Sequence, residues 1–212
     1  MIIIGVTGNS GSGKSTVSTI IKNNTGALVI NADEIANKLR DEQTEYYDKI
    51  LEIFGEDVLS KKQKYAGKID KAALATAIFN DETKREMLNK LTFRYVGMET
   101  KKIIFDNKES DFIVLDFPLL YEGGFDKICN YVIAVTSDEK AKVDRLKERD
   151  NIKELQVQKR LDSQKTDEEF KSLANFTIEN PSTNRYLNLV KDTIRVIHKI
   201  KAEEEKKKKG EA

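Results

Sequence analysis

Cysteine, net charge and long apolar runs are all scarce in this sequence of 212 residues. A single cysteine, Cys129, excludes an internal disulfide framework and a cysteine-based zinc site, and it favours the cytoplasm. The 37 Lys and Arg nearly balance the 36 Asp and Glu, so no global field holds a nucleic acid or an anionic membrane. No window approaches the ~20 apolar residues of a membrane span, and the run 2–4 is too short for a signal peptide. We therefore expect a cytoplasmic protein, a monomer or weak homo-oligomer, with small-molecule partners.

Five short apolar runs, each broken by turn residues, are typical of buried strands. They cover 1–7, 27–31, 112–116, 131–136 and 175–179. Helical patterns separate the runs, and this alternation predicts an α/β fold: an open parallel sheet of about five strands with helices on both faces. The length favours a single domain, with its core at about 1–42, 108–136 and 175–200.

The segments between these runs predict three additions to the core. About 80 residues separate the second run from the third, far more than a crossover needs, which predicts a helical insertion at about 43–107. The segment 137–165 is helical in pattern and dense in charge, and it contains Arg145, Arg149 and Arg160. Apolar residues at helical spacing from Tyr186 to Ile200 predict a closing helix, with the charged tail 201–212 as its frayed, solvated end.

Residues 8–15, Gly-Asn-Ser-Gly-Ser-Gly-Lys-Ser, fit the phosphate-binding pattern G-x-x-x-x-G-K-[ST] in full. The glycines let successive backbone N–H groups converge on phosphates, and a helix beginning near Ser15 adds its positive N-terminal end. Lys14 would neutralise the β- and γ-phosphates of ATP, and the Ser15 hydroxyl would bind Mg²⁺. The predicted nucleotide contacts in this loop are Gly8, Gly11, Ser12, Gly13, Lys14, Ser15 and Thr16.

The loop alone does not distinguish a kinase from another nucleotide hydrolase. A GTPase would need a guanine-specifying N-K-x-D and a switch D-x-x-G, and neither pattern occurs in the chain. The sequence therefore favours a kinase, in which the insertion would hold the acceptor.

Two acids follow predicted strands, where the ligand crevice of an open α/β sheet lies. Asp33 could accept a proton from an attacking hydroxyl or hold Mg²⁺ through water, or it could instead cap the helix that follows. Asp116 ends the third run and is expected at the metal-facing acidic position, with a turn residue as the alternative.

Further motifs in the same order resemble those of the dephospho-coenzyme A kinase family, from Ile4 to about Asn180. They include D-x-P-L-L-[FY]-E at 116–122, which is the most diagnostic, and an A-D pair on the second run. The others are F-G-E-D-V-L at 54–59, I-D-K-x-x-L at 69–74, I-F-N-D at 78–81, R-L-x-x-R-D at 145–150 and R-x-x-S-Q at 160–164.

The resemblance implies transfer of the ATP γ-phosphate to the ribose 3′-hydroxyl of dephospho-coenzyme A. It places Thr7 and Asp33 beside that hydroxyl, with Asp33 as the base. It makes the segment at about 137–165 a lid, in which Arg145 would reach the phosphates. Arg149 and Asn180 would contact the nucleotide. The insertion would be the acceptor-binding part.

For Arg145, Arg149 and Arg160, surface ion pairs are the alternative to a role in the lid. The sequence departs from the family pattern at two places: Asn31 stands where an acid is usual, and Phe93-Arg94 replaces a His-Pro pair of the acceptor region. Two other functions stay open: a nucleoside or deoxynucleoside monophosphate kinase, and a non-catalytic nucleotide-binding regulatory module.

Overall fold

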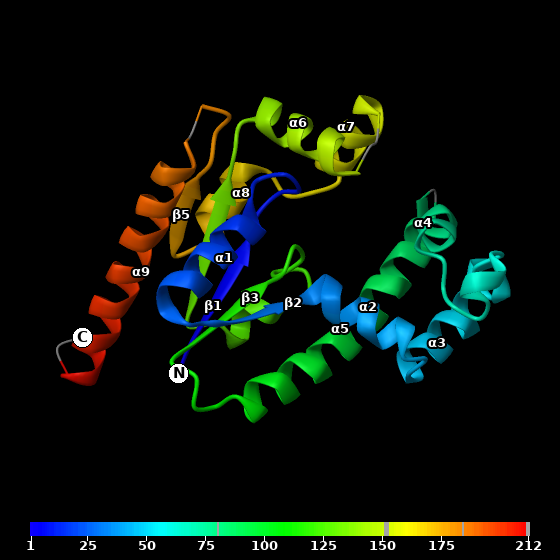
Figure 1. Ribbon diagram of the computed structural model, residues 1–212, viewed down its shortest axis with the longest axis horizontal. Coiled ribbons are helices and arrows are strands. Elements are labelled where there is room, and N and C mark those ends of the chain that lie inside the picture. The colour runs from blue at the N-terminus through cyan, green and yellow to red at the C-terminus, as the bar shows by residue number, and fades with distance from the viewer. Residues whose placement is uncertain (80, 151–152, 184, 211–212) are drawn as a thin grey trace. The chain divides into compact units, whose positions relative to one another are not determined.

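The computed structural model describes residues 1–79, 81–150, 153–183 and 185–210, and within these the chain divides into two compact units. The first unit, Met1–Ile30 with Lys108–Ala212, contains a five-stranded sheet in the order β2-β3-β1-β4-β5 (Figure 1). The pairs β1–β3, β1–β4 and β4–β5 are parallel. The strands are β1 (Ile2–Thr7), β2 (Leu28–Asn31), β3 (Phe112–Asp116), β4 (Tyr131–Thr136) and β5 (Phe176–Glu179). The predicted open parallel sheet is confirmed, and each strand begins and ends within one residue of its apolar run.

Two helices, α1 (Lys14–Thr25) and α9 (Tyr186–Lys208), pack on each other and on one face of the sheet. Figure 1 shows α9, at the red end of the colour range, beside β5. Their apolar side chains meet alternate strand residues such as Ile4 and Val6 in one continuous core. Each large aliphatic side chain buried there contributes about 1.5–3 kcal/mol to folding.

The opposite face is covered by the segment after β3 and by α8 (Asp167–Leu173). Side chains alternate along a strand, so Gly5 faces away from its neighbours Ile4 and Val6. A Cβ at Gly5 would lie 2.8 Å from Leu120 Cδ2, which leaves no room for a larger residue. The sheet therefore has helices on both faces, as predicted.

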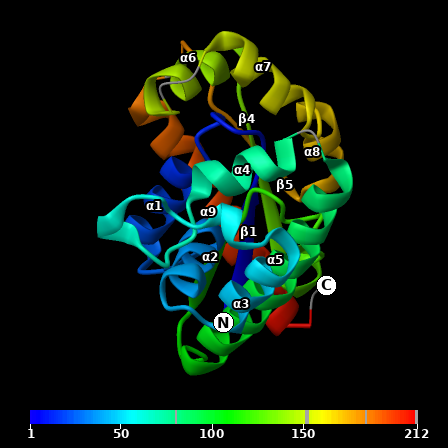
Figure 2. The same ribbon diagram turned by 90° about the vertical axis from the view of Figure 1, so that its right-hand side faces the viewer.

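Helices α6 (Glu139–Asp150) and α7 (Glu154–Asp162) lie together at the end of the sheet where β1 and β4 finish (Figures 1 and 2). They occupy the segment expected to be a lid, of which residues 151 and 152 lie outside the described part. No helix in the described ranges is both long and apolar enough to cross a membrane.

The second unit, Asn31–Asn107, contains the predicted insertion and has a core of its own. Its helices are α2 (Ala32–Asp41), α3 (Glu45–Phe54), α4 (Lys71–Phe79) and α5 (Glu82–Asp106), with two short 3₁₀ turns, η1 (Glu56–Val58) and η2 (Gln63–Tyr65). The core consists of Tyr46, Tyr47, Ile50, Val58, Ile69, Leu74 and Tyr95. The rings of Tyr46 and Tyr95 pack in a tilted arrangement, with 5.6 Å between their centroids.

Asn31 and two of the family motifs supply helix caps in this unit. The Asn31 side chain accepts hydrogen bonds from the N–H groups of Asp33 and Glu34, so Asn31 caps α2. Asp70 caps α4 in the same way, and Asp81 caps α5; residue 80 of that last motif lies outside the described part. The alternative in which Asp33 caps its own helix is therefore wrong, because Asn31 already satisfies those donors.

Residues 201–208 of the predicted tail are the last two turns of α9. They are almost all exposed, as predicted for the solvated end of that helix, but they are helical and not frayed. Glu204 accepts a hydrogen bond from the Tyr131 hydroxyl at 2.8 Å, and Lys207 donates to both groups. Lys207 also lies 4.7 Å from the Tyr131 ring centroid. These contacts with the sheet order the charged end of the helix; residues 211 and 212 lie outside the described part.

The Asn31 cap gives a first testable prediction. Asn31→Ala should lower the free energy of unfolding by about 1 kcal/mol, because two N–H groups at the start of α2 lose their acceptor. Asn31→Asp, which keeps an acceptor and restores the usual family residue, should cost little. Urea denaturation followed by circular dichroism measures both; equal stability of Asn31→Ala and the wild type would contradict the assignment.

Candidate active site

The loop 8–13 connects β1 to α1 and turns back on itself at glycines. Gly8 and Gly13 have φ angles of 139° and 101°, which other residues rarely adopt. The space around them is also closed: a Cβ at Gly8 would lie 2.1 Å from the carbonyl oxygen of Val135, and one at Gly13 would lie 2.3 Å from Asn180 Nδ2. Two independent reasons thus require glycine at each of these positions: the φ angle and the lack of space for a Cβ.

The N-terminus of α1 is built for an anion. Gly13 is its N-cap residue and has no side chain to satisfy the first N–H groups, and the first turn has no acidic residue. The partial positive charge of the helix end is therefore left to a ligand, as in phosphate-binding loops. Ser15 and Thr16 are exposed in this first turn, where they can contact such a ligand.

The Lys14 ammonium lies over the loop and is buried. Its Nζ donates to the carbonyl oxygen of Asn9 at 2.9 Å, and the N–H of Ser12 donates to the same oxygen at 3.1 Å. The lysine that the motif assigns to the phosphates is thus held at the mouth of the loop by a main-chain acceptor.

Asp116 and Thr7 lie at the carboxyl ends of neighbouring strands, next to the loop. Val6 pairs with Asp116 in the sheet, so Thr7 is one residue beyond this pair and both side chains are buried. Thr7 Oγ1 is 3.5 Å from the carbonyl oxygen of Pro118, a long and weak hydrogen bond. The sheet therefore brings the predicted acid of strand three to the start of the loop.

Arg145 contacts the outer side of the loop. Its Nη1 donates to the carbonyl oxygens of Gly11 at 3.0 Å and Ser12 at 3.3 Å, and its Nη2 donates to that of Asn180 at 3.0 Å. The Asn180 side chain donates to the Ser12 carbonyl as well, at 2.9 Å. In a trans peptide the C=O and N–H point in opposite directions, so these donors turn the Gly13 N–H away from Arg145.

Arg149 and Arg160 both form ion pairs with Asp150. Arg149 Nε is 2.7 Å from Asp150 Oδ1, and Arg160 Nη1 is 2.9 Å from Oδ2. Hydrogen bonding by Arg149 is the main cause that holds the pKa of Asp150 below its usual range, and the charges of Arg149 and Arg160 add to it against the effect of burial. Arg149 and Arg160 thus form the ion pairs that were the alternative to a role in the lid. Arg145 instead contacts main-chain oxygens of the loop.

Asp33 belongs to the second unit, two residues beyond the end of β2. It is exposed in the first turn of α2, where Asn31 provides the cap. The Asp33 carboxylate is therefore not engaged in capping, which leaves it available for chemistry.

The diagnostic motif after β3 serves packing at Tyr121. Its ring lies 6.4 Å from that of Phe170, and its hydroxyl is buried with no hydrogen-bond partner among the described residues. Burial raises the pKa of Tyr121 to about 12, so the phenol is neutral near pH 7. This explains why the motif accepts Phe or Tyr at this position.

Residues 93 and 94, where the sequence departs from the family pattern, lie inside a helix of the second unit. This helix, α5, runs without a break from Glu82 to Asp106. The Arg94 guanidinium lies 5.5 Å from the centroid of the Tyr95 ring.

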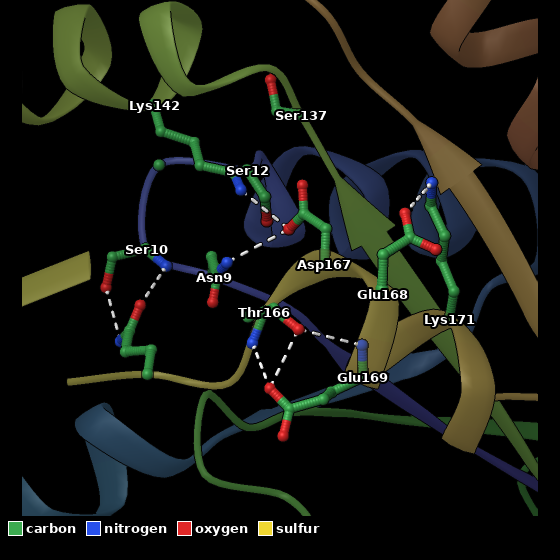
Figure 3. A network of polar contacts seen from close by, with 12 residues as sticks. Asn9, Ser10, Ser12, Ser137, Lys142, Thr166, Asp167, Glu168, Glu169 and Lys171 are labelled. Carbon is green, nitrogen blue, oxygen red and sulfur yellow. Dashed lines mark hydrogen bonds and ion pairs between the residues drawn. The ribbon is translucent and has the colours of Figure 1, made fainter. Parts of the chain in front are cut away.

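Three polar residues at the loop were not predicted as site residues: Lys142, Gln164 and Asp167. Gln164 hydrogen-bonds to Ser10. Asp167 contacts Asn9 and Lys142, and Figure 3 shows these two contacts. Gln164 stands in the R-x-x-S-Q motif, which was the one available signal, but nothing in the sequence pairs it with the loop 154 residues away.

The residues fit a bound nucleotide with Mg²⁺. The loop offers N–H groups and Lys14 for phosphates, and Ser15 offers an exposed hydroxyl beside them. Within the described ranges no three His, Cys, Asp or Glu side chains gather to hold a metal alone. Mg²⁺ suits such a site, because it is usually bound by one or two protein groups together with phosphate oxygens and water.

Fold and site together define a P-loop kinase, a class in which positioned N–H groups and a lysine direct phosphoryl transfer. A family model described as dephospho-CoA kinase matches residues 2–185. The chain belongs to the dephospho-CoA kinase family.

Individual relatives agree with this assignment. The dephospho-CoA kinase of Oryza sativa subsp. japonica is 36% identical over 86% of this chain and 78% of its own length, and that of Thermobifida fusca is 34% identical over 89% and 92%. The solved dephospho-CoA kinase from Campylobacter jejuni is 30% identical with a TM-score of 0.62, covering 93% of this chain and 96% of its own. A shikimate kinase from Acinetobacter baumannii, 14% identical with a TM-score of 0.53 and 95% of each chain covered, shares the fold. These similarities support the predicted family and give no support to the monophosphate-kinase alternative.

The geometry of Gly13 gives a second prediction. Gly13→Ala should weaken Mg·ATP binding at least about tenfold, because its Cβ would displace Asn180 and strain the loop. Gly26→Ala is the matched control: Gly26 has φ 73° at the other end of α1, with nothing within 4 Å of a Cβ. The control should lose some stability but keep its affinity in isothermal titration calorimetry. Wild-type affinity in Gly13→Ala would contradict the role of this glycine.

Proposed function

We propose that this protein transfers the γ-phosphoryl group of ATP to the ribose 3′-hydroxyl of dephospho-coenzyme A, giving coenzyme A and ADP. The observation that carries the proposal is an intact phosphate-binding loop, ahead of a helix N-terminus without a cap or an acid, in a chain of the dephospho-CoA kinase family. The intact Lys14, Ser15, Asp33 and Asp116 argue against a non-catalytic regulatory module.

In this proposal the loop binds ATP through main-chain N–H groups. Lys14 keeps its hydrogen bond to the Asn9 carbonyl and donates its other N–H groups to the phosphates. Ser15 would hold Mg²⁺ directly and Asp116 would hold it through water. When bound, Mg²⁺ would neutralise phosphate charge as the bond to the leaving group breaks. The proposed nucleotide contacts are Gly8, Gly11, Ser12, Gly13, Lys14, Ser15, Thr16, Arg149 and Asn180.

Asp33 is the proposed general base. Its carboxylate would take the proton of the 3′-hydroxyl while the oxygen of that hydroxyl bonds to the γ-phosphorus and the bond to ADP breaks. Its exposure, and the cap that Asn31 provides, support the assignment. Thr7 would lie beside the same hydroxyl.

Arg145 would serve the phosphates from its observed position. A charge there, behind the carbonyls of Gly11 and Ser12, favours an anion in front of the loop and keeps the Gly13 N–H turned toward it. In the lid 137–165, Arg149 and Arg160 would then be the arginines that exchange Asp150 for phosphate on closure.

The segment 43–107 is the proposed acceptor-binding part, attached to a single P-loop kinase domain. It has its own core and lies within a compact unit of its own. We propose further that the enzyme acts in the cytoplasm as a monomer or weak homo-oligomer, on a small molecule and not on nucleic acid or a membrane.

The base assignment predicts a split between turnover and binding. Asp33→Asn should lower kcat about 10²–10⁴-fold, the usual contribution of a general base, while the Kd for Mg·ATP changes little. Glu34→Gln, the adjacent exposed acid on α2, is the matched control and should retain activity. Near-normal kcat in Asp33→Asn would remove Asp33 from the mechanism.

The acceptor is tested by coupled ADP release with a panel of acceptors. Dephospho-coenzyme A should support turnover that depends on Mg²⁺, whereas nucleoside and deoxynucleoside monophosphates should not. Turnover with a monophosphate but not with dephospho-coenzyme A would overturn the proposed acceptor. Tight ATP binding without transfer to any acceptor would instead favour the regulatory module.

A further inference from the structure

The connection between α7 and α8 holds the first half of the phosphate-binding loop through Gln164. The amide oxygen of Gln164 accepts the N–H of Ser10 at 2.9 Å, and its amide nitrogen lies 3.0 Å from Ser10 Oγ. One glutamine thus makes two hydrogen bonds to one loop residue, to its main chain and to its side chain. An apolar side chain of the same length would make neither.

The first of these bonds fixes the plane of the peptide between Asn9 and Ser10. Because N–H and C=O point in opposite directions across a trans peptide, an N–H directed at Gln164 directs the Asn9 carbonyl the other way. That carbonyl accepts from Lys14 Nζ at 2.9 Å and from the Ser12 N–H at 3.1 Å. Gln164 and Lys14 therefore bind opposite sides of the same peptide group.

A second contact, from the first residue of α8, holds the Asn9 side chain. Asn9 Nδ2 donates to Asp167 Oδ1 at 3.1 Å, and Lys142 Nζ lies 2.7 Å from that oxygen (Figure 3). The Lys142 side chain is 9% exposed and that of Asp167 is 23% exposed, so the pair is largely shielded from water. The lysine neutralises an acid that would otherwise repel phosphate, so Asp167 can anchor the loop without opposing the ligand.

We propose that Gln164 is a positioning residue for the kinase reaction. It holds the Asn9–Ser10 peptide so that the Asn9 carbonyl seats Lys14 at the mouth of the loop, and the Asp167–Lys142 pair keeps Asn9 itself in place. Loss of Gln164 frees this peptide to rotate, which removes the acceptor that orients the ammonium. The inference rests on the proposed use of ATP by the loop.

The test is a double-mutant cycle on Mg·ATP binding with the full chain. Gln164→Met, of similar length without hydrogen-bonding groups, should raise the Kd about tenfold in the wild-type background, the value of about two hydrogen bonds. In the Lys14→Ala background the same change should raise the Kd less than about twofold, because the ammonium it positions is gone. Isothermal titration calorimetry measures each Kd, and circular dichroism checks the fold of each variant.

Gln158→Met is the matched control, since Gln158 is a half-buried residue of α7 whose amide donates to Asp162. It should change neither Kd. An equal loss for Gln164→Met in both backgrounds, or no loss in either, would overturn the inference. If Gln164→Met does not fold, Ser10→Ala replaces it: this variant removes only the hydroxyl contact and should raise the Kd about threefold, again only when Lys14 is present.

The wild-type titration separates this inference from the proposed function. No binding of Mg·ATP by the wild type would remove the proposed function itself. If the wild type binds Mg·ATP and Gln164→Met binds it with the same Kd, only the proposed role of Gln164 is removed.

Discussion

The orientation of a few peptide groups between β1 and α1 is the constraint on which the rest of this structure depends. A loop that binds phosphate must turn its N–H groups inward, and the N-terminus of α1 must be free of any competing cap. The carbonyl of Ser12 is held from outside by Arg145 and Asn180, and the N–H of Ser10 is held by Gln164. Residues far from the loop in the sequence thus determine the direction in which its N–H groups point.

The parallel sheet makes this arrangement possible. Registers of Val6 with Asp116 and of Thr7 with Ala134 bring the carboxyl ends of β1, β3 and β4 to one edge. The loop lies where β4 and β5 end. Arg145, on the helix that follows β4, and Asn180, the residue after β5, therefore both reach it. Two apolar layers on the faces of the sheet provide the stability, which leaves this edge free for polar groups that serve a ligand.

Much of this could be predicted from the sequence, because buried strands and a phosphate-binding loop leave strong local signals. Apolar runs located the strands, and the glycines of the loop are required by local backbone angles that a motif records. Some of the interactions that were missed connect residues far apart in the sequence, such as Gln164 with Ser10. Others arise where two neighbouring residues can both cap a helix, as Asn31 and Asp33 can at the start of α2, where Asn31 is the cap. The ordered end of α9 was missed for the same reason: its charge pattern predicts the exposure of these residues, but not the contact of Glu204 with Tyr131, some 70 residues earlier. The roles of the site residues in catalysis stay predictions.

Amide chemical shifts of the loop test the central claim most directly. In ¹H–¹⁵N correlation spectra of the wild-type protein, saturation with Mg·ATP should move the amide proton signals of Gly13, Lys14 and Ser15 downfield as they donate to phosphate. The amide of Gly26, at the far end of the same helix, should stay in place. Loop amides that do not respond to Mg·ATP would contradict the account.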